Sequence, residues 1–232
     1  MRTYRRSSGT FHERPYFTDH EVDEMCEGEL KKTGFLPASP CQIRIDRFIE
    51  KRFGVSLSFD DLPEGIVGLT CFNNAGVASV HVSRALVEEG TLAADRRVSS
   101  TLAHEAGHGL MHAHLFAFKP KDPLLFKNDP DIEPTKVMCR GDERDLRQKY
   151  NGKWWEHQAN MAIGSLLLPA SLVESAISPF LTESGLLCTR VLDPSRREEA
   201  SIEIAKIFNV NPPVARYRLE RLFCPSGNQP WL

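Results

Sequence analysis

The chain has 232 residues, of which 29 are Lys or Arg and 31 are Asp or Glu, so its formal net charge is -2. Its apolar fraction of 41% and charged fraction of 26% are typical of a soluble globular protein. These values exclude a disordered, collagen-like or coiled-coil chain. The balanced charge gives no general attraction to nucleic acid, so direct nucleic-acid binding is possible only through a local basic surface and is not favoured.

Three features of the sequence indicate the compartment. The longest strongly apolar stretch, residues 161–168, is far shorter than the roughly 20 residues that span a bilayer. The basic N-terminus continues into polar and acidic residues, unlike a secretory signal. No C-x-x-C pair occurs among the six cysteines, which argues against a disulfide framework or a thiolate zinc finger. We therefore expect a cytoplasmic protein with reduced cysteines and no membrane span.

The predicted organisation has three parts. Residues 1–36 are expected to form an N-terminal arm that lies over the domain or is partly mobile, with a short helix at about residues 19–32. Residues 37–178 are expected to form the main domain, interrupted by a Pro-rich and charged insertion at 117–152. Residues 179–232 are expected to form a C-terminal helical extension that resembles a helix-turn-helix.

The main domain is predicted to begin with a helix. Ser39 is expected to be its N-cap, with Pro40 at the first helical position and Gln42 completing a capping box. Gly54 is expected to end it. One face of this helix carries an apolar stripe of Ile45, Phe48, Ile49 and Phe53.

Alternating apolar residues then predict strands at 55–59, 66–70 and 77–82, which together form a small, mainly antiparallel sheet. Helical spacing follows at 92–116 and again at 154–168, where Pro169 stops the second helix. In the C-terminal part, Asp193-Pro194 and Pro212-Pro213 are expected to open two further helices, which reach Phe208 and Phe223. These elements predict an α+β fold.

The motif His104-Glu105-Ala106-Gly107-His108 lies inside the predicted helix 92–116. Residues four apart share one face of a helix, so both imidazoles can bind one tetrahedral ion while Glu105 projects beside the remaining position. Gly107 and Gly109 are poor helix formers, which indicates the close approach of another element. Imidazole ligands with an open water position favour zinc.

The third ligand must come from another part of the chain. Glu156 lies at the start of the second predicted helix and would complete a His₂Glu set. His114 is the alternative, but Met111 stands where the motif H-E-x-x-H-x-x-G-x-x-H requires glycine. His112 is on the same straight helix as the two motif histidines, too far along it to converge with them, and we expect it to pack or to support the site.

A wider combination of motifs resembles the ImmA/IrrE family of bacterial metallo-endopeptidases. The similar segments are residues 101–108 (TLAHEAGH), residues 156–160 (EHQAN) and residues 166–169 (LLLP), in an overall resemblance that covers about residues 40–175. The resemblance implies a zincin-like fold in which the sheet packs beside the H-E-x-x-H helix and a second ligand helix. It implies that His104, His108 and Glu156 bind Zn²⁺ and that Glu105 is the catalytic glutamate.

The same resemblance implies a function and a partner. The family cleaves peptide bonds, so we expect a zinc-dependent endopeptidase whose protein substrate is a transcriptional repressor or an antitoxin-type regulator. Two alternatives remain, a zinc-containing DNA-binding regulator and a non-catalytic partner-binding module. A structural zinc site would have four protein ligands, and a binding module would not need Glu105.

Other residues have weaker assignments. Trp154 and Trp155 could line a peptide cleft, but we favour a role in attaching their helix to the core. Asn160, one turn after Glu156, is expected to orient a ligand or to be a buried capping amide. His157 and Tyr150 are candidate donors to a tetrahedral oxyanion.

The last predicted helix contains Arg216, Arg218 and Arg221, which are expected to form a basic face. Such a face could contact DNA. Pro212 and Pro213 remove backbone N–H groups that would help to hold a phosphate. We therefore expect this helix to serve as a lid or as a docking surface for a protein substrate.

Overall fold

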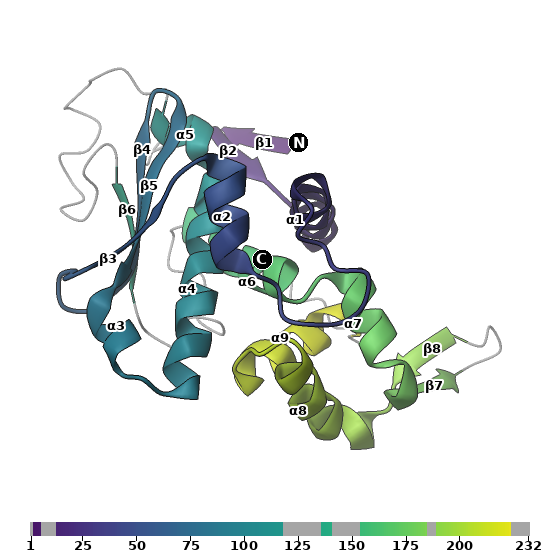
Figure 1. Cartoon of the computed structure of the whole chain (residues 1–232). Helices are drawn as coiled ribbons and strands as arrows, with labels where there is room; N and C mark the ends of the chain where they lie inside the picture. The colour runs from purple at the N-terminus through teal and green to yellow at the C-terminus, as the bar shows by residue number, and fades with distance from the viewer. Residues whose placement is uncertain (1, 6–12, 118–135, 141–153, 185–188, 224–232) are drawn as a thin grey trace.

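The computed structural model describes residues 2–5, 13–117, 136–140, 154–184 and 189–223. These residues form an α+β structure in which a small mixed sheet lies beside a group of helices (Figure 1). The predicted fold class is therefore confirmed at the level of α+β.

The central sheet has four strands in the order β3 (Leu57–Asp60), β5 (Gly76–Ser83), β4 (Ile66–Asn73) and β6 (Lys136–Arg140). β3 and β5 are parallel, whereas β4 is antiparallel to both of its neighbours. The three strands expected from the sequence are present. The fourth, β6, lies within the segment 117–152 that we expected to be an insertion, and its pairing with β4 was not predicted.

The helix with the H-E-x-x-H motif is α4 (Leu92–Met111), and the second ligand helix is α6 (Trp154–Leu167). The side chain of Thr91 caps α4 by accepting a hydrogen bond from the backbone N–H of Ala94. α4 packs against α6 on one side and against β4 and β5 on the other. The predicted helix does not continue unbroken to residue 116, because α4 ends at Met111 and a separate short helix follows, α5 (Ala113–Ala117).

Gly107 lies where α4 packs tightly against α6. A Cβ atom at Gly107 would lie 2.7 Å from Cβ of Ala162 and 3.2 Å from the backbone of Ala159. A Cβ at Gly109 would lie 2.6 Å from the ring of Phe53, the last residue of α2 (Ile45–Phe53). The prediction that these glycines mark the close approach of another element is therefore confirmed.

The helix α2 (Ile45–Phe53) is shorter than expected. Gly54 ends it with a left-handed φ of 68°, as predicted, but the N-cap is Arg44, and the predicted start at Ser39 is wrong. Ile43 and Ile45 are both buried. The chain turns at Arg44 (φ -81°, ψ 73°), where the N–H of Ile45 donates a hydrogen bond of 3.0 Å to the carbonyl of Ile43. This turn places both isoleucines in the core, and the helix begins only at Ile45.

The N-terminal segment contains a hairpin of β1 (Arg2–Arg5) and β2 (Glu13–Tyr16), followed by α1 (Asp19–Thr33). A capping box between Thr18 and Glu21 starts α1. The helix packs against α6 and α2. Its inward face is completely buried in the main hydrophobic core, through Val22, Cys26 and Leu30.

The C-terminal part consists of α7 (Ala170–Ala176), the 3₁₀ turn η2 (Ser178–Phe180), a hairpin of β7 (Leu181–Ser184) and β8 (Thr189–Leu192), the 3₁₀ turn η3 (Pro194–Arg196), α8 (Arg197–Ile207) and α9 (Pro212–Leu222). Asp193 and Pro212 start the last two helical segments, as predicted. The hairpin was not predicted.

The turn between α8 and α9 is attached to α4. Asn209 adopts a left-handed φ of 51° in this turn, a conformation that asparagine tolerates better than most residues. Its side-chain oxygen accepts a hydrogen bond of 3.0 Å from Nε of Arg96, and Asn211 donates to the backbone carbonyl of Ala93. One hydrophobic cluster includes buried residues of α1, α2, β5, α4, α6, α7, α8 and α9.

The prediction of a basic face on α9 is wrong, because its arginines form ion pairs within the chain. Arg218 is only 4% exposed, and its guanidinium pairs with Asp23 of α1 at 2.7 Å. Arg216 pairs with Glu198 of α8, also at 2.7 Å, and Arg221 pairs with Asp19. These ion pairs join α9 to α1 and to α8.

Replacing Arg218 by Met should lower the free energy of unfolding by about 3–5 kcal/mol, because it leaves Asp23 with an uncompensated, largely buried charge. Arg216→Met, which removes a pair exposed to solvent, should cost less than about 1 kcal/mol. Urea unfolding of the two variants measures the difference. Equal losses would show that Asp23 does not depend on its partner.

Gly107→Ala should destabilise the protein by about 1–3 kcal/mol, because the added methyl group forces α4 away from α6. Gly28 of α1 is the matched control, since a Cβ there would have no atom within 4 Å. Gly28→Ala should stabilise by up to about 1 kcal/mol through helix propensity alone. If both variants gained stability in thermal unfolding, the inferred tight contact would be wrong.

No single helix among the described residues is long and apolar enough to cross a membrane. The pair α6 and α7 would meet that test together in length and composition, with a bend of 49° between the two helices.

Candidate metal centre

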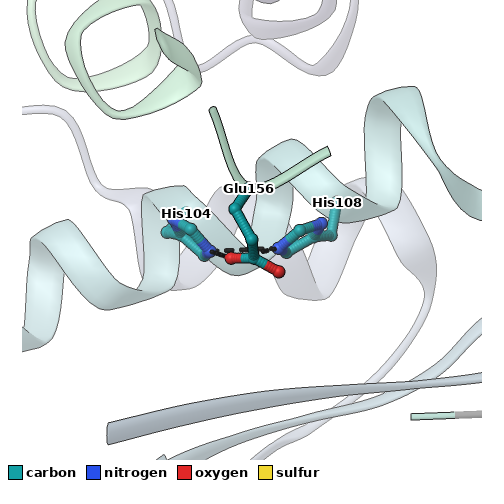
Figure 2. Close-up of side chains that lie close together, drawn as sticks. All are labelled: His104, His108 and Glu156. Carbon is teal, nitrogen blue, oxygen red and sulfur yellow. Dashed lines mark hydrogen bonds and ion pairs between the residues drawn. The ribbon is translucent and has the colours of Figure 1, made fainter. Parts of the chain in front are cut away.

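Two helices bring three potential ligands together. His104 and His108 lie one turn apart on α4, and Glu156 comes from the first turn of α6 with its carboxylate between the two rings (Figure 2). Oε2 of Glu156 is 3.2 Å from Nε2 of His104 and 3.6 Å from Nε2 of His108. The two Nε2 atoms are 3.0 Å apart. The predicted ligands are thus brought to one place.

These separations fit a bound metal ion. An ion held at about 2.0–2.1 Å by imidazole nitrogens in tetrahedral geometry separates its ligand atoms by about 3.3 Å. The three separations lie on either side of that value. Among the described residues, His104, His108 and Glu156 form a group that could hold a metal ion, with one ligand atom from each within 4.8 Å of the others.

The protonation states of the ligands are also suitable. Burial lowers the pKa of His108, which keeps its imidazole neutral and able to bind a cation. Burial alone would raise the pKa of Glu156, but the two facing histidines outweigh this effect and hold the pKa well below its usual range. Glu156 is therefore a carboxylate, and the site combines two nitrogen donors with one anionic oxygen.

Glu105 is the fully buried acid of this site. Its Oε2 accepts a hydrogen bond of 2.5 Å from the hydroxyl of Thr70 on β4. Its Oε1 is buried and has no hydrogen-bond partner among the described residues. Burial raises the pKa of Glu105 to about 7, although His104 and the Thr70 hydroxyl act in the opposite direction. A carboxyl group with this pKa can both accept and release a proton near neutral pH.

Gly68 lets β4 pass close to this carboxylate. A Cβ at Gly68 would lie 2.5 Å from Oε1 of Glu105 and 2.6 Å from Cγ2 of Thr101. Sequence reasoning placed Gly68 and Thr70 in a strand but assigned them no role. The available signal was the alternation along β4, which puts both residues on the buried face between the apolar Ile66 and Phe72.

The second nitrogen of each ligand ring also has a partner. Nδ1 of His104 is 2.9 Å from Oδ1 of Asn160, so Asn160 orients the ring of His104. Of the two roles predicted for Asn160, this agrees with the orienting role. Nδ1 of His108 is 3.0 Å from Nδ1 of His112, and Nε2 of His112 is 2.9 Å from Oε1 of Gln158. His112 supports the site, as expected, whereas Gln158 was not identified from the sequence.

The remaining candidates lie elsewhere. His114 is on α5, beyond the end of α4, and is not a member of the three-residue group. Trp154 and Trp155 are only 7% and 6% exposed and pack with Phe72, which confirms that they attach α6 to the core. His157 is half-buried on α6, and burial lowers its pKa. Tyr150 lies outside the described residues.

A scan against protein-family models and a search of the curated proteins both found no match for this chain.

Metal content should distinguish the two candidate third ligands. Glu156→Gln removes the anionic member of the three-residue group and should strongly reduce zinc binding, whereas His114→Gln should leave one ion per chain. Mass spectrometry of native protein equilibrated with zinc measures the stoichiometry. Loss of metal in the His114 variant alone would contradict the assignment of Glu156.

Proposed function

We propose that this protein is a zinc-dependent endopeptidase. The observation that carries the proposal is the pairing of a three-ligand group with a buried glutamate that has one carboxylate oxygen unpartnered among the described residues. Three protein ligands leave a fourth position for water, which is the arrangement of catalytic zinc sites. The resemblance of residues 101–108 and 156–160 to the ImmA/IrrE family supports the same activity and a zincin-like fold.

The donor set favours zinc as the resident ion. Two neutral imidazoles and one carboxylate are the ligands of the His₂Glu zinc enzymes. Hard cations such as Mg²⁺ and Ca²⁺ prefer oxygen ligands throughout. When bound, zinc would polarise the scissile carbonyl and make a water molecule more acidic.

Glu105 would move the proton in this reaction. The Thr70 hydroxyl holds Oε2, so Oε1 is the atom that accepts the proton of the attacking water. The same oxygen would then give that proton to the amine that leaves from the cleaved peptide bond.

The proposed substrate is a protein, and the resemblance favours a transcriptional repressor or an antitoxin-type regulator in the cytoplasm. The arginines of α9 do not supply the docking surface that we expected, since Arg216, Arg218 and Arg221 are paired within the chain. For the same reason we do not propose DNA binding by α9.

Glu105→Gln should keep zinc and lower the rate of peptide cleavage by about 10²–10⁴, because an amide can hold a water molecule but cannot take its proton. The measurement uses zinc-loaded protein and a mixture of peptides from a digested bacterial proteome, with new N-termini identified by mass spectrometry. Glu174→Gln, an exposed position on α7, is the control and should cleave like the wild type.

Two outcomes would count against the peptidase. Wild-type protein that produces no new N-termini, although it binds one zinc per chain, would favour a non-catalytic binding module. Cleavage that persists unchanged in the Glu105 variant would show that another group acts as the base.

A further inference from the structure

A line of hydrogen-bonding groups runs from the ligand His108 through the protein to the N-terminal strand β2. After His108 and His112, the line reaches Gln158 of α6, whose Nε2 donates a hydrogen bond of 2.8 Å to the backbone carbonyl of Pro15. His108 and His112 are completely buried, and Gln158 is 5% exposed. Each group in the line therefore depends on its neighbours for hydrogen bonds.

The direction of every bond in this line follows from its outer end. The carbonyl of Pro15 can only accept, so the amide NH₂ of Gln158 must face it and Oε1 must face His112. Because Oε1 can only accept, the neutral ring of His112 carries its proton on Nε2. Its Nδ1 is then an acceptor for the Nδ1–H of His108.

This direction leaves Nε2 of His108 without a proton. That nitrogen is the atom that faces Glu156 and His104 in the candidate metal centre. The tautomer that a metal ion requires is thus the one that the Pro15 carbonyl selects three hydrogen bonds away. Partners of this kind fix the orientation of ligand rings and raise their basicity.

We propose that His112 and Gln158 are positioning residues that hold His108 in its metal-binding tautomer, and that the N-terminal segment fixes them through the Pro15 carbonyl. The inference rests on the proposed metal centre but not on the proposed peptidase activity. It makes β2 part of the metal centre, although Pro15 is 93 positions from His108 in the sequence and supplies no ligand.

Zinc affinity tests the proposal, measured by competition with a chelator on the full-length chain. His112→Leu removes the acceptor and should weaken zinc binding by about 10–100-fold. His112→Asn should recover most of this loss, because its amide oxygen can accept from Nδ1–H of His108. Gln158→Met, which keeps the side-chain length, should weaken binding by about tenfold. His114→Gln is the histidine control and should bind zinc like the wild type.

Two kinds of result would overturn the proposal. One comes from zinc affinity, if His112→Leu binds zinc like the wild type or if His112→Leu and His112→Asn lose equal affinity. Equal losses would indicate a packing role alone, because packing would not separate the two variants. The other comes from nitrogen NMR of the imidazole rings in the zinc-loaded wild type, which requires no variant to fold. We expect the proton of His112 on Nε2, and a proton on its Nδ1 would contradict the direction of the line.

Neither readout measures catalysis. A protein that binds zinc and shows the expected affinities but cleaves no peptide would retain the positioning role and lose only the peptidase. A protein that cleaves peptides while its His112 variants bind zinc normally would retain the peptidase and lose the positioning role.

Discussion

The close packing of α4 against α6 is the constraint on which the candidate site depends. Gly107 precedes His108 on α4 and faces Ala159 and Ala162 of α6. Small residues on both helices let the backbones approach, so that the carboxylate of Glu156 reaches both imidazoles. Any larger side chain at this contact would separate the nitrogen ligands from the oxygen ligand, because packed interiors have little space to absorb extra atoms.

The sheet and α6 contribute different groups to the candidate site. α6 supplies Glu156, Asn160 as the partner of His104, and Gln158 as the partner of His112. β4 holds Glu105 from the opposite side through Thr70 and the close approach at Gly68. The same burial that raises the pKa of Glu105 to about 7 lowers the pKa of His108. Burial favours the neutral form of both groups, and the two pKa values shift in opposite directions because one group is a base and the other an acid.

The described N-terminal and C-terminal elements β2, α1 and α9 are attached to the elements that carry the candidate site. The carbonyl of Pro15 in β2 accepts a hydrogen bond from Gln158, and Asp23 of α1 pairs with the buried guanidinium of Arg218 in α9. The turn before α9 is also hydrogen-bonded to the first half of α4, through Asn209 and Asn211. Segments that are distant in sequence thus stabilise the positions of α4 and α6, the two helices that carry His104, His108 and Glu156.

The sequence by itself determined the features that depend on local spacing. His104 and His108 share a face because they are four residues apart on one helix, and Gly54 and Pro212 mark helix ends through their own backbone chemistry.

Only the tertiary structure decided which groups meet across elements. α2 begins at Ile45 and not near Ser39, because Ile43 and Ile45 are buried together. α9 has no basic face of the predicted kind, because Asp19, Asp23 and Glu198 pair with its arginines. The roles of Gln158, Thr70 and Gly68 depend on partners 143, 35 and 37 positions away in the sequence. The partner is Pro15 for Gln158 and Glu105 for the other two residues. Contacts of this kind arise from packing between distant segments, which local propensity does not encode.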